Sequence, residues 1–219
     1  MPGILADLKE KAEKELQASR LTFRRVETYG TYRRLVLYIE GLPAKQEDIS
    51  KEVKGPPKES AFDSSGRPTK AAEGFAKSYG IKVSDLKIKK AGEKEFVFAK
   101  VTEKGILTEK ILEQLFPKVI RSLYQPISMK WGDVDFKFIR PVHWIFAAFG
   151  NKIIDFEVAG IKSSNRTYGH RSLSPKPMVI SVAKGIDIII FKAVLLKSKV
   201  ILDQDERREK RGKMSETLG

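Results

Sequence analysis

Residues 32–40 have the sequence Tyr-Arg-Arg-Leu-Val-Leu-Tyr-Ile-Glu, and this stretch decides the class of fold. Apolar side chains stand at every second position, at Leu35, Leu37 and Ile39. Because successive side chains of a strand point to opposite faces, this alternation predicts a β-strand with one buried face. Gly-Leu-Pro at residues 41–43 ends the strand.

Outward from this strand, several segments have apolar residues at intervals of three and four, which is the spacing of an amphipathic helix. Residues 4–18, 69–79 and 108–124 show this spacing. Pro117 lies inside the last segment and is expected to kink or split the helix, because proline has no backbone N–H to donate. Residues 178–198 are also predicted to be helical.

Short segments between these helices predict further strands. Turns that contain glycine, at residues 91–94 and 150–152, join neighbouring segments and predict hairpins. Residues 44–68 have little periodicity and predict a long ordered loop, and residues 162–177 predict a polar loop. The expected strands are residues 86–90, 95–102, 134–139, 142–149 and 153–158.

Together these segments predict an α+β fold with mixed, largely antiparallel sheets and flanking helices. The residue pattern of the sequence changes near residue 125, so we expect two domains. Residues 1–124 are predicted to form an N-terminal α+β region, and residues 125–219 a β-hairpin-rich region that ends in a helix. Residues 203–213 are almost wholly charged, which indicates that this helix leads away from the core toward further domains.

The chain carries a large excess of positive charge. Lysine and arginine number 42 against 28 acidic residues, which gives a formal net charge of +14 over 219 residues. Such a surplus attracts polyanions, so nucleic acid or an anionic membrane surface is the natural partner, and a soluble protein with many lysines is the alternative. The sequence has no cysteine, which excludes thiolate metal sites and suits a cytoplasmic protein. Its apolar stretches are too short to span a bilayer, and no membrane partner is expected.

The sequence does not predict a self-contained catalytic or metal site. It contains no phosphate-binding glycine motif and no Gly-x-Ser-x-Gly nucleophile motif. His143 follows an apolar pattern beside Trp144 and is predicted to be a hydrogen-bonded core residue, whereas His170 leaves a structural role and anion contact equally open. Asp133 and Asp135 share one side of a predicted strand, but no third ligand accompanies them.

Basic and aromatic side chains occur together in several places, notably at residues 33–34, 130–131 and 166–171. Guanidinium groups bind phosphates and aromatic rings stack on unpaired bases, which is how single-stranded RNA is held. A solvated face or a structural ion pair is the alternative for each patch, above all for Arg140, which precedes a proline. The predicted polyanion contacts are Arg33, Arg34, Lys130, Trp131, Arg140, Arg166, His170 and Arg171.

Several motifs occur in a distinctive order and spacing. They are Thr-Tyr-Arg-Arg-Leu at 31–35; Lys-Gly-Pro-Pro at 54–57 with Ala-Ala-Glu-Gly-Phe-Ala at 71–76; Met-Lys-Trp-Gly at 129–132 with Phe-Ile-Arg-Pro-Val-His-Trp at 138–144; and Tyr-Gly-His-Arg at 168–171. In this arrangement residues 4–173 resemble the N-terminal third of the β subunit of bacterial heterotetrameric glycyl-tRNA synthetase.

The resemblance implies a part of the enzyme that joins glycine to its tRNA with ATP. It implies that ATP and Mg act at the separate α subunit, and that this fragment binds no cofactor and has no catalytic residue. The partners that it implies are the α subunit and tRNA(Gly), in a holoenzyme with two α and two β subunits. The predicted polyanion contacts then become candidate tRNA contacts.

Two other functions stay open beside tRNA contact. A scaffold module would use its surface to bind protein, and its basic charge would serve only solubility. An editing-type hydrolase is suggested by analogy with related synthetase modules, although the sequence supplies no obvious nucleophile or metal ligand set. Residues 186–191 are more apolar than the resemblance implies. If they are exposed in this chain, they would be sticky or would mark a surface that other parts of the protein normally cover.

Overall fold

The computed structural model describes residues 2–63, 65–92, 94–123, 129–131, 134–138 and 140–217. Its helices are α1 (Pro2–Ala18), α2 (Lys58–Ala61), α3 (Lys70–Ser78), the 3-10 helix η1 (Val83–Asp85), α4 (Thr108–Ser122), α5 (Ile188–Lys197) and α6 (Gln204–Thr217). Its strands are β1 (Arg25–Thr31), β2 (Arg34–Glu40), β3 (Ile49–Pro57), β4 (Lys87–Ala91), β5 (Lys94–Glu103), β6 (Met129–Trp131), β7 (Val134–Phe138), β8 (Ile145–Phe146), β9 (Ala148–Phe149), β10 (Lys152–Ile153), β11 (Glu157–Val158), β12 (Ile161–Ser164), β13 (Arg166–Tyr168) and β14 (Pro177–Val179).

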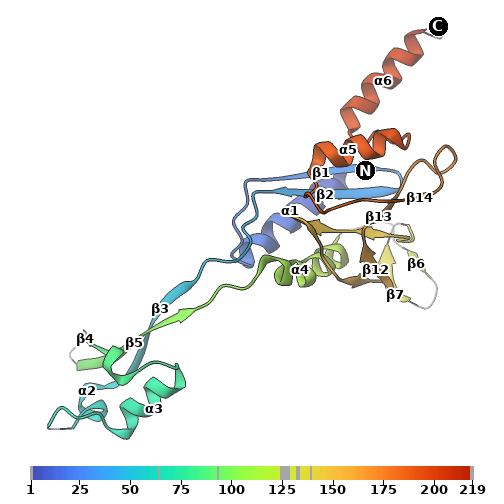
Figure 1. The fold of residues 1–219 in the computed structure, drawn as a ribbon. Coiled ribbons are helices and arrows are strands. Elements are labelled where there is room, and N and C mark those ends of the chain that lie inside the picture. Colours follow the sequence, from blue (N-terminus) through green and yellow to red (C-terminus); the bar gives the residue numbers. More distant parts are fainter. Residues whose placement is uncertain are drawn as a thin grey trace. The chain divides into compact units, whose positions relative to one another are not determined.

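The described residues form two compact units (Figure 1). Unit 1 combines residues 1–45 with residues 106–219, and unit 2 consists of residues 46–105. The boundary predicted between residues 124 and 125 lies outside the described residues and stays a prediction. The predicted α+β class is confirmed, since helices flank small sheets whose described pairings are antiparallel except for β12 with β8.

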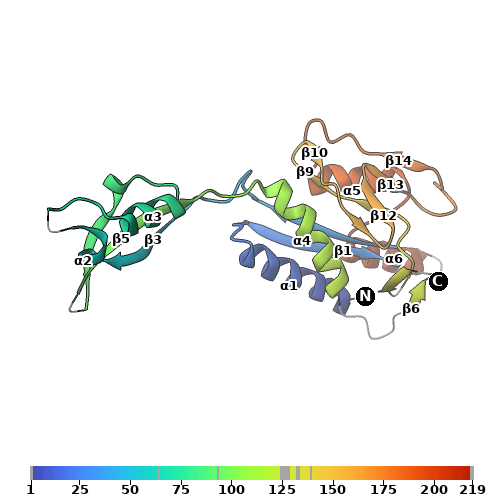
Figure 2. The same cartoon turned by 90° about the horizontal axis from the view of Figure 1, so that it is seen from below.

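The β1–β2 hairpin is the centre of unit 1, and helices cover both of its faces. Leu35, Leu37 and Ile39 pack against a core to which α1 and α4 contribute. Val36 and Tyr38 point the other way and pack against a second core, to which α5 contributes. Figures 1 and 2 show α1 and α4 on one side of the hairpin and α5 on the other. The prediction of a single buried face was therefore wrong, because α5 covers the second face.

Short strands complete unit 1 and bring distant segments together. Gly150, with a positive φ of 56°, sits in the predicted turn between β9 and β10. The parallel pairing of Ser163 with Ile145 places β12 beside β8. β13 pairs antiparallel with β14, with Tyr168 opposite Pro177. Residues 162–177, predicted to be a polar loop, therefore contain most of β12 and all of β13.

Unit 2 is a three-stranded sheet in the order β3–β5–β4, with α2 and α3 on one face. The helix predicted over residues 69–79 and the strands predicted at 86–90 and 95–102 are confirmed as α3, β4 and β5. The ordered loop predicted over residues 44–68 is wrong, because β3 and α2 occupy much of it. The register of β3 with β5 shifts between Lys54 and Pro57, so the prolines lie where the ladder is already irregular.

Two predicted helices differ from the observed ones. α5 covers only Ile188–Lys197, because residues 177–179 belong to β14 and Asp187 begins the helix. The Asp187 carboxylate accepts a hydrogen bond from the backbone N–H of Ile190 at 2.7 Å, which is an N-cap contact. α4 runs through Pro117 as one helix, so the predicted split does not occur.

Candidate nucleic-acid interface

Arg34, at the first position of β2, holds three separate segments of unit 1 together. Its Nη2 donates to the carbonyl oxygens of Tyr168, at 2.6 Å, and Gly169, at 3.5 Å. Its Cζ lies 5.8 Å from the centre of the Trp144 ring, within the range of a cation–π contact. The Trp144 and Tyr168 rings contact each other, with centroids 4.9 Å apart and planes inclined by 48°. We call Arg34, Trp144 and Tyr168 the arginine–aromatic site.

The backbone segment that accepts hydrogen bonds from Arg34 is tightly packed. A Cβ atom added to Gly169 would lie 2.8 Å from both the Ser174 hydroxyl and the Ser198 Cβ, so this position has no room for a side chain. His170 donates its backbone N–H to Ser198 at 2.9 Å. The Tyr168 and Gly169 carbonyls are consequently held in place as acceptors for the guanidinium.

The charge of Arg34 is only partly compensated. Burial, and then the positive charge of Arg33, lower the pKa of the Arg34 guanidinium to about 10, so the group keeps its charge at neutral pH. Its Nε is buried and has no hydrogen-bond partner among the residues that the structure describes. In the described part of the chain Arg34 makes no ion pair with a carboxylate. A half-buried cation without a counterion favours the approach of an anion.

A cavity of about 1050 Å³ adjoins this site in unit 1. Arg33, Arg140 and Arg171 line it together with Arg34, and all three of these further arginines are exposed. None of the three makes an ion pair within the described ranges. The cavity therefore combines four guanidinium groups with aromatic rings, Trp144 and Tyr168 among them, which suits a ligand that carries both phosphates and planar bases.

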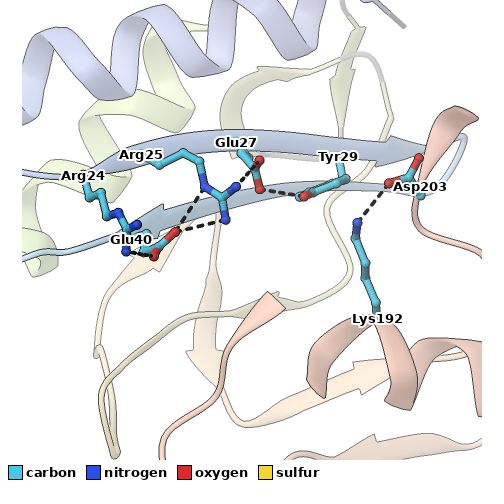
Figure 3. Close-up of polar contacts among 7 residues, drawn as sticks. All are labelled: Arg24, Arg25, Glu27, Tyr29, Glu40, Lys192 and Asp203. Atoms are coloured by element: carbon cyan, nitrogen blue, oxygen red, sulfur yellow. Dashed lines mark hydrogen bonds and ion pairs between the residues drawn. The ribbon is translucent and has the colours of Figure 1, made fainter. Parts of the chain in front are cut away.

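Other arginines of the same hairpin are neutralised, and the comparison is informative. Figure 3 shows Arg24 and Arg25 sharing the Glu40 carboxylate, at 3.1 and 3.0 Å. Arg25 also pairs with Glu27 at 3.2 Å, and Glu27 accepts a 2.7 Å hydrogen bond from the Tyr29 hydroxyl. These guanidinium groups are engaged in the structure of the sheet, whereas Arg33, Arg140 and Arg171 at the cavity make no ion pair among the described residues.

Seven of the eight predicted contacts divide into three groups, and the eighth is His170. Arg33, Arg34, Arg140 and Arg171 gather around the cavity. Arg166 is exposed on β13 and does not line the cavity. Lys130 and Trp131 lie in β6, but their side chains lie outside the described part of the structure. Arg140 is exposed and makes no ion pair among the described residues, so its alternative as a buried ion-pair residue is not realised.

The structure contradicts the prediction for one histidine and favours one of the two alternatives for the other. His143 is exposed and lines the cavity between two strands, so the prediction of a core histidine is wrong. The His170 Nδ1 accepts hydrogen bonds from the backbone N–H groups of Ser172, at 3.3 Å, and Leu173, at 3.2 Å. His170 thus stabilises the turn after Gly169. This contact favours the structural role of the two that the sequence left open.

Trp144 was missing from the predicted contacts. Its only signal in the sequence was its place at the end of the Phe-Ile-Arg-Pro-Val-His-Trp motif. Asp133 lies outside the described residues, as does the side chain of Asp135, so the idea of a cation site there stays untested. The described residues contain no group of three or more His, Cys, Asp or Glu side chains placed to hold a metal ion. Among the described helices, none combines the length and the apolar character needed to cross a membrane.

The fold and the site define a basic α+β protein whose arginines around the cavity, which make no ion pair with the described carboxylates, and whose aromatic rings suit a polyanion that carries bases. More particularly, the chain belongs to the family of the glycyl-tRNA synthetase beta subunit, whose sequence model matches residues 1–218. This confirms the resemblance and extends it beyond residue 173.

Individual relatives agree with the family match. The chain is 42% identical over 209 residues to the glycine–tRNA ligase beta subunit of Desulforudis audaxviator, which covers 95% of this chain and 30% of the relative. It is 43% identical over 209 residues to that of Syntrophomonas wolfei, with the same coverage. It is 40% identical over 205 residues to that of Desulforamulus reducens, covering 94% of this chain and 29% of the relative. The chain thus spans less than a third of the length of these relatives.

Proposed function

We propose that this chain is the part of a glycine–tRNA ligase beta subunit that contacts tRNA through the arginine–aromatic site. Glycine activation with ATP and Mg is then the task of the α subunit, and this region contributes no catalytic residue. The observation that carries the proposal is Arg34, a half-buried guanidinium that has carbonyl and aromatic partners but no carboxylate partner within the described ranges. Phosphate oxygens would supply the missing counterion.

The test uses the full-length beta subunit together with the α subunit. Arg33→Ala with Arg171→Ala removes two exposed cations from the cavity rim, and Arg34→Lys keeps the charge but loses the planar guanidinium. We expect about tenfold weaker tRNA binding and a salt dependence that is flatter by about 0.7–0.9 for each lost phosphate contact. Glycine-dependent adenylate formation at the α subunit should be unchanged.

Arg121→Ala is the matched control, because Arg121 is an exposed arginine of α4 that does not line the cavity. It should leave both the affinity and the salt slope close to those of the parent. If the Arg33/Arg171 variant and Arg34→Lys both bind and glycylate tRNA like the parent, or if Arg121→Ala weakens binding equally, the assignment of the arginine–aromatic site is incorrect.

A protein contact is a second candidate function, and α5 favours it. Ile189 is 74% exposed and Leu196 is 49% exposed, and they lie seven positions apart, about two helical turns, on the outer side of a helix whose inner side is buried. We propose the α subunit as the occupant of this face. Ile189→Ser with Leu196→Ser should weaken the copurification of the α subunit, while Lys197→Ser, in the last turn of the same helix, should not.

A further inference from the structure

The sheet of unit 2 has one face that its helices do not cover. On the covered face, Val97 and Ala99 of β5 are fully buried, and Val97 packs against Ala61 of α2 and Ala72 of α3. β5 alternates, so Phe96 and Phe98 point to the opposite face. Both rings are partly exposed, and neither belongs to a hydrophobic cluster of the described residues.

Lysines surround these two rings. The register places Lys54 of β3 and Lys87 of β4 on either side of Phe98, and Lys89 beside Phe96. The Lys54 ammonium lies 3.5 Å from the centre of the Phe96 ring, and that of Lys89 lies 5.9 Å from the centre of Phe98. Lys100, two positions after Phe98, continues the same side of β5. We call Lys54, Lys87, Lys89, Phe96, Phe98 and Lys100 the lysine–phenylalanine face.

The charge of this face is strongly unbalanced. Glu52 is the one carboxylate that the register of the described strands places among these lysines, and it pairs with Lys89 at 2.6 Å. The hydrogen bond from Lys89, followed by the charges of Lys87 and Lys100, lowers the pKa of Glu52, which places these cations close to it. Lys54, Lys87 and Lys100 have no carboxylate partner among the described residues.

We propose that the lysine–phenylalanine face binds unpaired nucleotides of RNA. Two rings at alternate positions of a central strand offer stacking surfaces for neighbouring bases, and lysines on all three strands can reach the intervening phosphates. The cations that now lie over the rings would move to the phosphates when bases replace them. This surface belongs to the other compact unit from the arginine–aromatic site and does not depend on the function proposed for it.

The chain of 219 residues can be tested with fluorescein-labelled oligouridylate and oligoadenylate of about ten nucleotides, by anisotropy. Phe96→Leu with Phe98→Leu keeps apolar side chains but removes the aromatic faces. Since stacking of each base is worth roughly fivefold or more, we expect about 25-fold weaker binding of the single strands. Binding of a blunt RNA duplex and the melting temperature of the protein should not change.

Lysine variants test the electrostatic half of the proposal. Lys54→Ala, Lys87→Ala and Lys100→Ala together should reduce the slope of log affinity against log salt by about 2, at about 0.7 for each phosphate contact with a single strand. Lys77→Ala, Lys82→Ala and Lys90→Ala form the control, since they remove the same charge from α3, from the segment before η1 and from the other face of β4. This control should change the slope by much less.

Three results would overturn the proposal. One is undiminished binding of the oligonucleotides by the phenylalanine variant. Another is an equal decrease of the salt-dependence slope in both sets of lysine variants, which would indicate non-specific electrostatic binding. The third is stronger competition by polyglutamate than by unlabelled oligouridylate, which assigns the face to an acidic protein segment. None of these results bears on the glycylation test of the arginine–aromatic site, because the variants lie in different units.

Discussion

At the scale of single residues, unit 1 separates cations that stabilise the structure from cations that are available to a ligand. Arg207 illustrates the first kind, since its guanidinium donates to the carbonyl oxygens of Gly30, at 2.6 Å, and Ile201, at 2.7 Å. Lys192 pairs with Asp203 at 2.9 Å, and its ammonium lies 4.2 Å from the centre of the Tyr29 ring (Figure 3). These contacts join α5 and the start of α6 to the hairpin.

Asp203 has two functions that substitutions can separate. The hydrogen bond from Lys192 lowers the pKa of the carboxyl, and its Oδ1 also accepts from the backbone N–H groups of Asp205 and Glu206 at the start of α6. Asp203→Asn keeps the cap and loses the ion pair, so we expect a loss of less than about 1 kcal/mol at pH 7. Asp203→Ala also loses the cap and should cost about 1 kcal/mol more.

The pH dependence of the stability change in Asp203→Asn follows from the direction in which the pKa of Asp203 is shifted. Because the folded pKa lies below the ordinary 3.8, the ion pair stabilises the protein above that value, and its contribution is lost as pH falls through the folded pKa. The difference in free energy of unfolding between parent and Asp203→Asn should therefore be constant near neutrality and shrink below about pH 4. Urea titrations at several pH values measure it, and a difference that persists undiminished at pH 3 contradicts the assignment.

Gly169 is predicted to be intolerant of any side chain. Gly169→Ala forces its Cβ against Ser174 and Ser198, so we expect a loss of about 1–3 kcal/mol of stability. The same shift would displace the carbonyls that accept from Arg34 and weaken tRNA binding. Gly74→Ala is the control, because nothing lies within 4 Å of a Cβ added to Gly74. Gly160→Ala is not suitable, because the φ of 76° at Gly160 strains any side chain. Comparison of the melting temperatures of Gly169→Ala and Gly74→Ala distinguishes the effect of a steric clash from the effect of reduced backbone freedom.

At the scale of elements, both faces of β2 are packed against apolar side chains. Leu37→Ala and Val36→Ala should each lower the free energy of unfolding by about 1 kcal/mol or more, since each opens a different core. Ile88→Ala, at a position of β4 that is 43% exposed, should change it by less than about 0.5 kcal/mol. A neutral effect of Val36→Ala in denaturant titrations would show that α5 does not pack on the hairpin in solution.

How well an element was predicted depended on whether its apolar pattern was complete within the element itself. α1, α3 and α4 each carry an apolar stripe, and the sequence located all of them. β3 was missed because Lys51, Glu52 and Lys54 interrupt the alternation, and the strand exists through its pairing with β5, about 50 positions away. α5 was predicted too long because residues 178–187 are also apolar, whereas β14 and the Asp187 cap depend on β13 and on local turn geometry.

The candidate site was only partly predictable for the same reason. Arg34 and Arg171 were identified from their residue types beside aromatic neighbours. That Arg34 meets Tyr168, 134 positions later, depends on the β12–β8 and β13–β14 pairings, which no local pattern specifies. Trp144 was overlooked because a tryptophan in an apolar segment usually indicates core packing. The lysine–phenylalanine face required the register of three strands, one of which was predicted to be a loop.

At the scale of the whole molecule, unit 2 is an insertion within the chain of unit 1, and this arrangement makes a further prediction. The ends of the insertion are close, since Lys45 and Leu107 form an antiparallel bridge and the Thr108 backbone N–H donates to Ala44 at 3.0 Å, all within unit 1. The Thr108 hydroxyl also donates to Pro43 at 2.5 Å. Replacing residues 46–105 by a short Gly-Ser linker should therefore leave unit 1 folded.

The shortened chain separates the two proposed RNA surfaces. It should keep a cooperative unfolding transition and the salt-dependent tRNA binding that Arg33→Ala with Arg171→Ala weakens, because the cavity arginines all belong to unit 1. It should lose the binding of oligouridylate that depends on Phe96 and Phe98. A circular-dichroism melt and the two anisotropy titrations measure these outcomes. Retention of oligouridylate affinity would place that binding in unit 1, and loss of the cooperative transition would show that unit 1 requires the insertion for its fold.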